Sequence, residues 1–260
     1  MDTVKASSGR QGQIMLVQGM PSAVSRGDLG LFPGTQPLGK RSRRGKTPSY
    51  HGVHGGYKAL GLALFESLLE RDFQTVLCAD PRVQAYAVQS HQLHYWLPSA
   101  SDGKTNQNPH IYTPDVSVIL KDGRPVVFEV KHSRLRLRES WQKREPHIRR
   151  AYIEDHGVHF QVVTEQNIRI QPRLSNYEIM LRHRHPADDV EAEIAVRDAL
   201  FRVRQQSNIG EVCDACLLRD NRLSRSYSAL IRLALGGEIG LDLNAPLSLA
   251  TAIVRKALDD

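Results

Sequence analysis

The chain has 260 residues, 40% of them hydrophobic and 24% charged, which suits either one sizeable domain with a small second one or two modest domains. No apolar run approaches the roughly 18 residues of a membrane span, and the N-terminus lacks the basic-then-apolar order of a secretory signal. We therefore expect a cytoplasmic protein without a membrane partner. Three cysteines, an odd and low number, argue against a disulfide framework.

The formal net charge of +7 is distributed unevenly along the chain. Residues 1–57 and 131–150 each hold eight Lys/Arg against two acids, whereas residues 186–260 hold nine against twelve. A polyanionic partner such as DNA would explain this distribution. A solvated helix face together with a basic tail would explain it equally well. The candidate DNA-binding residues are Lys40, Arg41, Arg43, Arg44, Arg134, Arg136, Arg138 and Lys143.

The first predicted elements are an arm and a helix. Residues 1–50 are rich in Gly, Ser, Pro and basic residues, a composition that predicts a flexible basic arm. Residues 59–73 predict a helix, because apolar side chains recur there at helical spacing. Glu66 lies at the rim of this apolar stripe, and the residues alone favour an ordinary surface glutamate.

Residues 112–131 predict a β-hairpin, preceded by one or two strands within 78–97 and a polar loop at 99–110. The turn is Lys121-Asp122-Gly123-Arg124, and Asp-Gly between β-branched runs is a strong hairpin signal. Alternation in the second strand places Val126, Phe128 and Val130 on one face, and Val127, Glu129 and Lys131 on the other. The hairpin would bring Asp115 to the same end of the sheet as Glu129 and Lys131.

A basic helix at about 140–156 and an apolar strand at 158–164 follow, so the second hairpin strand and this strand should be parallel. The predicted core is therefore an α/β fold with a mixed sheet. Residues 172–186 are interpreted as a connector.

The C-terminal residues predict a small, mostly helical domain. Helices are expected at 190–205, 209–218 and 223–235, a strand at 238–243 and a closing helix at 247–258. This is the outline of a winged helix, whose third helix would bring Arg222, Arg225 and Arg232 to DNA. The acidic surplus makes docking to a protein an equal alternative. Cys213 and Cys216 are interpreted as buried small residues, since no second cysteine pair completes a zinc site.

Asp115, Glu129 and Lys131 form a PD…ExK pattern, with thirteen residues between the two acids. Carboxylates can hold a divalent metal that activates water and stabilises charge on a phosphodiester, and the carbonyl of Val130 could add a ligand. Lys131 would orient the water or stabilise the transition state. The plain alternative is a surface hairpin carrying a Glu–Lys pair.

These residues carry a resemblance to the TnsA family, the endonuclease subunits of heteromeric transposases. The matching segments are 65–73, 79–83 leading to Gln89, 112–115, 128–131 and 163–169, so the resemblance spans about 48–170. It implies a restriction-endonuclease-like fold. Together with the composition of the first residues and the element pattern of the last, this predicts a flexible arm at 1–50, a PD-(D/E)xK nuclease domain at 51–172 and a winged-helix-like domain at 187–260.

The resemblance also implies the site and its partners. Glu66 and Asp115 would bind Mg²⁺, for which Mn²⁺ could substitute. Glu129 would be a further metal ligand, and Lys131 would be the catalytic lysine. Such subunits cut the 5′ ends of the transposon while a TnsB-like transposase cuts and joins the 3′ ends, and a TnsC-like AAA+ ATPase docks on the C-terminal region. This implies a bacterial, nucleoid-associated enzyme acting on double-stranded DNA. The alternatives are a stand-alone nuclease for repair or restriction, and a non-catalytic DNA-binding adaptor.

Overall fold

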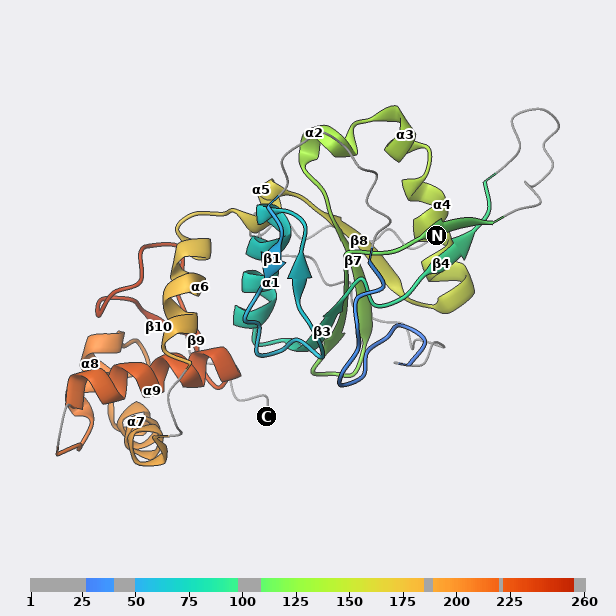
Figure 1. Ribbon diagram of the computed structural model, residues 1–260. Coiled ribbons are helices and arrows are strands. Elements are labelled where there is room, and N and C mark those ends of the chain that lie inside the picture. The colour runs from blue at the N-terminus through green and yellow to red at the C-terminus, as the bar shows by residue number, and fades with distance from the viewer. Residues whose placement is uncertain (1–26, 40–49, 98–108, 185–188, 220–221, 255–260) are drawn as a thin grey trace, which may run out of the picture.

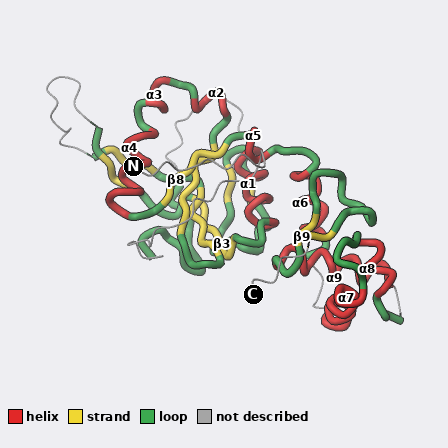
Figure 2. Tube along the Cα trace, turned by 180° about the vertical axis from the view of Figure 1, so that it is seen from behind, coloured by secondary structure: helices red, strands yellow, loops and turns green. Residues whose placement is uncertain are grey.

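The computed structural model describes residues 27–39, 50–97, 109–184, 189–219 and 222–254 (Figures 1 and 2). Its centre is a four-stranded sheet in the order β3-β6-β7-β8. The strands are β3 (Val83–Val88), β6 (Val116–Leu120), β7 (Pro125–Val130) and β8 (His159–Val163). β6 is antiparallel to both β3 and β7, whereas β8 is parallel to β7, which confirms the predicted hairpin, crossover and mixed sheet.

The chain also forms helices and three short strand pairs, some of which pack on this sheet while the C-terminal ones form a cluster of their own. The helices are α1 (Leu68–Ala79), α2 (Ser133–Arg136), α3 (Glu139–Gln142), α4 (Glu145–Arg150), a π-helical turn η1 (Ala151–Asp155), α5 (Glu165–Ile168), α6 (Arg173–Arg182), α7 (Val190–Arg202), α8 (Ile209–Ala215) and α9 (Arg222–Gly236). The antiparallel pairs are β1 (Gly52–Val53) with β2 (Leu64–Phe65), β4 (Leu93–Tyr95) with β5 (His110–Tyr112), and β9 (Gly240–Leu241) with β10 (Ile253–Val254). Among these helices none is long and apolar enough to cross a membrane.

The alternation along β7 divides the core as predicted. Val126, Phe128 and Val130 belong to one apolar cluster with α1, and the rings of Phe73 and Phe128 meet edge to face with centroids 5.2 Å apart. Val127 belongs to a second cluster on the opposite face, with residues of α4 and η1. The sheet is thus covered on both faces, with α1 on one side and α4 on the other (Figure 1).

Phe73 should be a main source of stability, because its side chain is fully buried between α1 and the sheet. Phe73→Ala is expected to lower the free energy of unfolding by about 3–5 kcal/mol, through lost apolar burial and the cavity left behind. Urea denaturation would measure the loss. Phe32→Ala is the matched control, since Phe32 is 50% exposed. Equal losses in the two variants would contradict this account of the core.

The predicted helix at 59–73 is wrong in its first half. α1 begins at Leu68, with Ser67 as its N-cap accepting a hydrogen bond of 3.2 Å from the Glu70 amide. Before it, Leu64 and Phe65 are extended and pair with β1. The Ser-x-x-Glu sequence at 67–70 is a helix-start signal that the apolar spacing obscured. Glu66 therefore lies immediately before the N-cap and not on the helix.

The C-terminal helices α7, α8 and α9 pack with β9 and β10 around an apolar cluster of their own, which includes Cys213 and Cys216 as buried free thiols. The predicted closing helix at 247–258 is wrong within 247–254, where the chain forms a turn and then β10. The Ser248 amide donates to the Thr251 hydroxyl oxygen at 2.9 Å, a side-chain bond that competes with helix formation. Residues 255–260 lie outside the described part.

Two segments that the sequence predicts to be a connector and a flexible arm make ordered contacts instead. The interpreted connector contains helix α6, whose Asn176 donates to the carbonyls of Leu243 and Ala245 and accepts from the Leu247 amide. Residues 27–39, inside the predicted arm, run against the sheet domain: Leu29 is 3% exposed, and its carbonyl accepts a 2.7 Å hydrogen bond from the Ser90 hydroxyl.

Candidate functional site

Asp115 and the end of β7 are held together by a direct hydrogen bond. Asp115 comes one residue before β6, and its Oδ2 accepts from the Val130 amide at 2.7 Å. The register of the hairpin, with Val116 opposite Phe128, produces this contact. Asp115 is 4% exposed, so its carboxylate is fixed at the end of the sheet where Glu129 and Lys131 also lie.

Glu129 and Lys131 form an ion pair on the same face of β7, as the alternation predicts. Lys131 Nζ lies 2.8 Å from Glu129 Oε1, and the Glu129 Oε2 accepts a 2.5 Å hydrogen bond from the Tyr112 hydroxyl. The ammonium of Lys131 also lies 4.1 Å from the ring centroid of Trp141, at cation–π distance. Tyr112 and Trp141 therefore fix the pair from two sides.

Tyr112 remains a hydrogen-bond donor at neutral pH. Burial, together with the neighbouring carboxylates of Glu129 and Asp115, raises the pKa of Tyr112 well above its usual value. Burial and the Glu129 carboxylate likewise raise the pKa of Tyr152. A protonated phenol beside Glu129 satisfies a buried carboxylate oxygen, which would otherwise carry a desolvation cost. The roles of Tyr112 and Trp141 could not be predicted from the sequence, because β4 and β5 are too short for their alternation to show that Tyr112 points inward.

Gln89 joins Glu66 to Asp115. Its side-chain amide donates to Glu66 Oε1 at 3.0 Å, and its backbone N–H donates to the Asp115 carbonyl at 3.0 Å. Gln89 directly follows β3, is 5% exposed and has φ of 45°, the one positive φ outside glycine in the part of the chain that is described. A residue held in this strained conformation at a cluster of acids is a candidate functional position.

The carboxylates partly meet the requirements of a metal. Within the described ranges no group of three or more His, Cys, Asp or Glu side chains is placed to hold an ion. Mg²⁺, however, needs only one or two carboxylates, with water and phosphate oxygens completing its shell. Asp115 and Glu66, which both accept hydrogen bonds from Gln89, carry such oxygens, and their binding of a metal stays a prediction. Glu129 binds Lys131 and Tyr112 in this arrangement, and its direct ligation of a metal, like that of the Val130 carbonyl, stays a prediction.

The basic segment that follows Lys131 is anchored beside the site. The Ser133 amide and hydroxyl donate to the Glu165 carboxylate, which ties the start of α2 to α5. Four predicted DNA-binding residues lie exposed on this segment: Arg134, Arg136, Arg138 and Lys143. Two of these are paired with acids, Arg136 with Glu145 and Lys143 with Glu139. The other four, Lys40, Arg41, Arg43 and Arg44, lie outside the described residues. Their contact with DNA stays a prediction.

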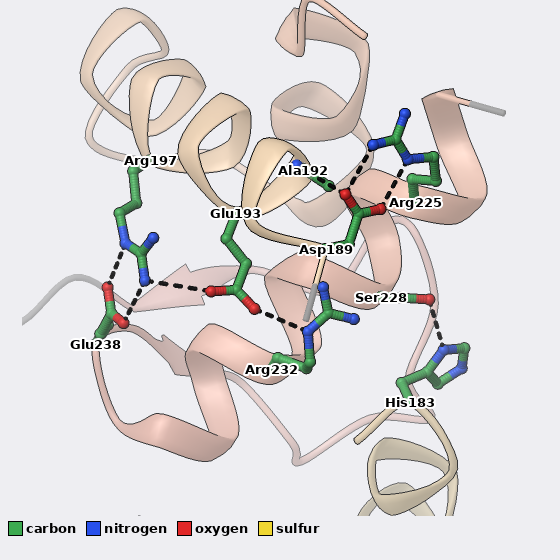
Figure 3. A network of polar contacts seen from close by, with 9 residues as sticks. All are labelled: His183, Asp189, Ala192, Glu193, Arg197, Arg225, Ser228, Arg232 and Glu238. Carbon is green, nitrogen blue, oxygen red and sulfur yellow. Dashed lines mark hydrogen bonds and ion pairs between the residues drawn. The ribbon is translucent and has the colours of Figure 1, made fainter. Parts of the chain in front are cut away.

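The arginines of α9 bind acids of the same C-terminal unit (Figure 3). Arg225 donates to Asp189 at 2.7 Å and to Glu191 at 2.6 Å, and Arg232 Nε donates to Glu193 at 2.9 Å. The hydrogen bond from Arg225 lowers the pKa of Asp189 to about 2. Two of the three arginines expected to meet DNA are thus neutralised by acids at or near the start of α7.

The fold and the site define an α/β domain with two carboxylates and a lysine at the end of a mixed sheet. Residues 80–165 match the family model of the TnsA-like endonuclease N-terminal domain. The match places a TnsA-like endonuclease N-terminal domain in this chain and supports a nuclease role in transposition. Asp115, Glu129 and Lys131 fall within the matched range, whereas Glu66 lies before it. A search of curated proteins found no match.

Proposed function

We propose that this protein is a Mg²⁺-dependent DNA endonuclease that cuts the 5′ ends of a transposon together with a partner transposase. The observation that carries the proposal is the constellation of Asp115, Glu129 and Lys131 inside a TnsA-like endonuclease domain. The mixed sheet is compatible with a restriction-endonuclease-like fold, in which acids at the end of a hairpin face the scissile phosphate.

Each residue of the proposed site would have its own role in cleavage. A divalent ion bound by Asp115 and Glu66 would lower the pKa of a water molecule and neutralise charge on the phosphate. Lys131 provides a fixed cation beside this position, which suits the negative charge that develops in the transition state. Glu129, Tyr112 and Trp141 hold that cation in place, so the site is organised before DNA binds.

Gln89 should act as a positioning residue for Glu66. Gln89→Ala removes the 3.0 Å hydrogen bond to Glu66 and leaves the Asp115 backbone contact in place. Losing such a supporting contact typically reduces metal affinity or activity by about 10–100-fold. We expect a loss in this range in cleavage assays, offset in part by raised Mg²⁺. The exposed neighbour Gln92 provides the control: Gln92→Ala should cleave normally, and equal rates for both variants would contradict the assigned role.

The C-terminal unit is proposed to dock a protein partner, such as a TnsC-like ATPase, instead of reading DNA through α9. Its arginines are paired internally, and the sequence of this region carries more acids than bases. Val190, Ile194 and Phe201 project from one face of α7 and are 57%, 52% and 88% exposed. Exposed apolar side chains that share a helix face suit a protein surface. A winged-helix architecture fits the three helices and the β9–β10 pair.

Reconstitution with partners tests the proposed function. Transposon-end DNA and Mg²⁺ would be incubated in three reactions: with this protein alone, with a partner transposase and ATPase alone, and with all three proteins together. Nicks would then be mapped on each DNA strand. We expect little cleavage by the protein alone and 5′-end nicks in the complete mixture. Strong cleavage of unrelated plasmid by the isolated protein would favour a stand-alone nuclease. Partner recruitment without cleavage in any mixture would favour an adaptor.

A further inference from the structure

A recess of about 400 Å³ lies between the sheet domain and the C-terminal unit. The sheet domain lines it with Tyr57, Lys58, Val83, Gln84 and Lys121, and the end of α6 and α9 line it with Arg184, Arg232, Leu235 and Gly236. Lys121 follows β6, whereas Asp115 precedes it, so β6 separates the recess from the carboxylate site. Five residues of strand span about 17 Å. The recess is therefore a separate site.

Four cationic side chains line this recess: Lys58, Lys121, Arg184 and Arg232. None of the described lining residues is acidic. Asp80, whose charge acts on Lys58, is itself paired with Arg82. Arg232 is paired with Glu193, whereas Lys58, Lys121 and Arg184 form no ion pair with the described residues. The recess thus holds three cations without an acidic partner at a junction of two units, an arrangement that an anion would stabilise.

The two arginines present hydrogen-bond donors to this space. Arg232 uses Nε to bind Glu193 (Figure 3), but its Nη2 is buried and has no hydrogen-bond partner among the described residues. A buried guanidinium donor left unpaired carries a desolvation cost. The guanidinium of Arg184 lies over the ring of Tyr57, 4.5 Å from its centroid. Stacking orients the planar fork while leaving its in-plane donors for a ligand.

Lys58 shows the same excess of positive charge. Its side chain is almost fully buried, with Nζ donating to the carbonyls of Asp80 and Leu77 at 2.6 and 3.4 Å. Burial lowers the pKa of Lys58 to about 8, and the charge of Lys121 acts in the same direction, against the opposing effect of Asp80. An anion bound nearby would favour the charged ammonium.

We propose that this recess binds a phosphate group, and that the bound phosphate holds the C-terminal unit against the sheet domain. Guanidinium groups match phosphate oxygens through paired, charge-assisted hydrogen bonds. Inorganic phosphate and phosphomonoesters carry close to two negative charges at neutral pH, so they balance the three unpaired cations of the recess better than a single carboxylate does. Lys58 and Lys121 come from the sheet domain and Arg184 and Arg232 from the other side, so one ligand bridges both units. Free phosphate and the terminal phosphate of a nucleotide both have this charge, whereas a DNA phosphodiester carries only one.

Binding of inorganic phosphate to the full chain tests the proposal independently of cleavage. Phosphate would be titrated at neutral pH and constant ionic strength, with calorimetry and the thermal unfolding midpoint as readouts. We expect saturable binding that raises the midpoint. Arg184→Gln should weaken binding by about tenfold or more, the size of a lost charge-assisted contact. Lys121→Gln should also weaken the binding of phosphate.

Arg182→Gln is the matched control, because Arg182 is exposed on α6 two residues earlier and does not line the recess. It should bind phosphate as the wild type does. Competition then identifies the source: displacement of phosphate by a nucleotide names the nucleotide as the ligand, and failure of the nucleotide to displace it leaves free phosphate. Two results would overturn the proposal: no phosphate binding by the wild type, or equal weakening by Arg182→Gln and Arg184→Gln.

Discussion

Lys131→Ala is expected to reduce the rate of DNA cleavage by about 10²–10³-fold while DNA binding is retained. In the proposed function Lys131 supplies the cation that faces the reacting phosphate, and removing one such electrostatic contact typically costs this much. The side chain is 19% exposed and is held by Glu129 and Trp141, so water cannot readily take its place. Cleavage under saturating protein, compared with binding measured without metal, would separate the two effects.

Lys143→Ala provides the control for Lys131→Ala. Lys143 lies on the same basic segment, but it is exposed and paired with Glu139. It should keep the rate of the chemical step. Thermal unfolding of Lys131→Ala would show whether the fold survives, because this change removes the ion-pair partner of the buried Glu129 carboxylate. Equal cleavage rates for Lys131→Ala and the wild type would show that Lys131 is not a catalytic residue.

Asp115→Asn is expected to reduce cleavage by about a hundredfold or more, and added Mg²⁺ should not restore it. The substitution preserves size, and the amide oxygen can still accept from the Val130 N–H, so the hairpin should remain folded. What is lost is the negative charge that would bind the metal. The rate measured across a range of Mg²⁺ concentrations tests this expectation.

Asp122→Asn makes the same chemical change at the turn of the same hairpin. Asp122 is exposed and paired with Arg124, and it lies at the opposite end of the β6–β7 hairpin from Asp115. It should leave cleavage unchanged. If Asp115→Asn recovered full activity at raised Mg²⁺, Asp115 would contribute to metal affinity without being indispensable to the reaction.

The hairpin could be predicted because its signals are local. Asp-Gly at the turn and the alternation from Val126 to Lys131 specify register and faces over a few residues. This information was enough to place Asp115, Glu129 and Lys131 at one end of the sheet. The parallel crossover to β8 followed from the order of elements alone.

The missed features depend on contacts between distant segments. The strained backbone of Gln89 and its hydrogen bond to Glu66 arise from how β3 meets the loop before α1, which no spacing pattern reveals. Apolar spacing placed the helix start too early, because Leu64 and Phe65 are also apolar in a short strand. The internal pairing of Arg225 depends on the packing of α7 against α9, so the sequence alone left DNA and protein as equal partners of that unit.

Strand-specific mapping of 5′-end nicks in the complete transposition mixture tests the central claim most directly. Wild-type protein, Asp115→Asn and Asp122→Asn would be compared in Mg²⁺, and wild-type protein also without any divalent ion. We predict nicks at the 5′ ends with the wild type and Asp122→Asn in Mg²⁺, and none with Asp115→Asn or without the ion. Equal nicking by the wild type and Asp115→Asn would contradict the assignment of this site.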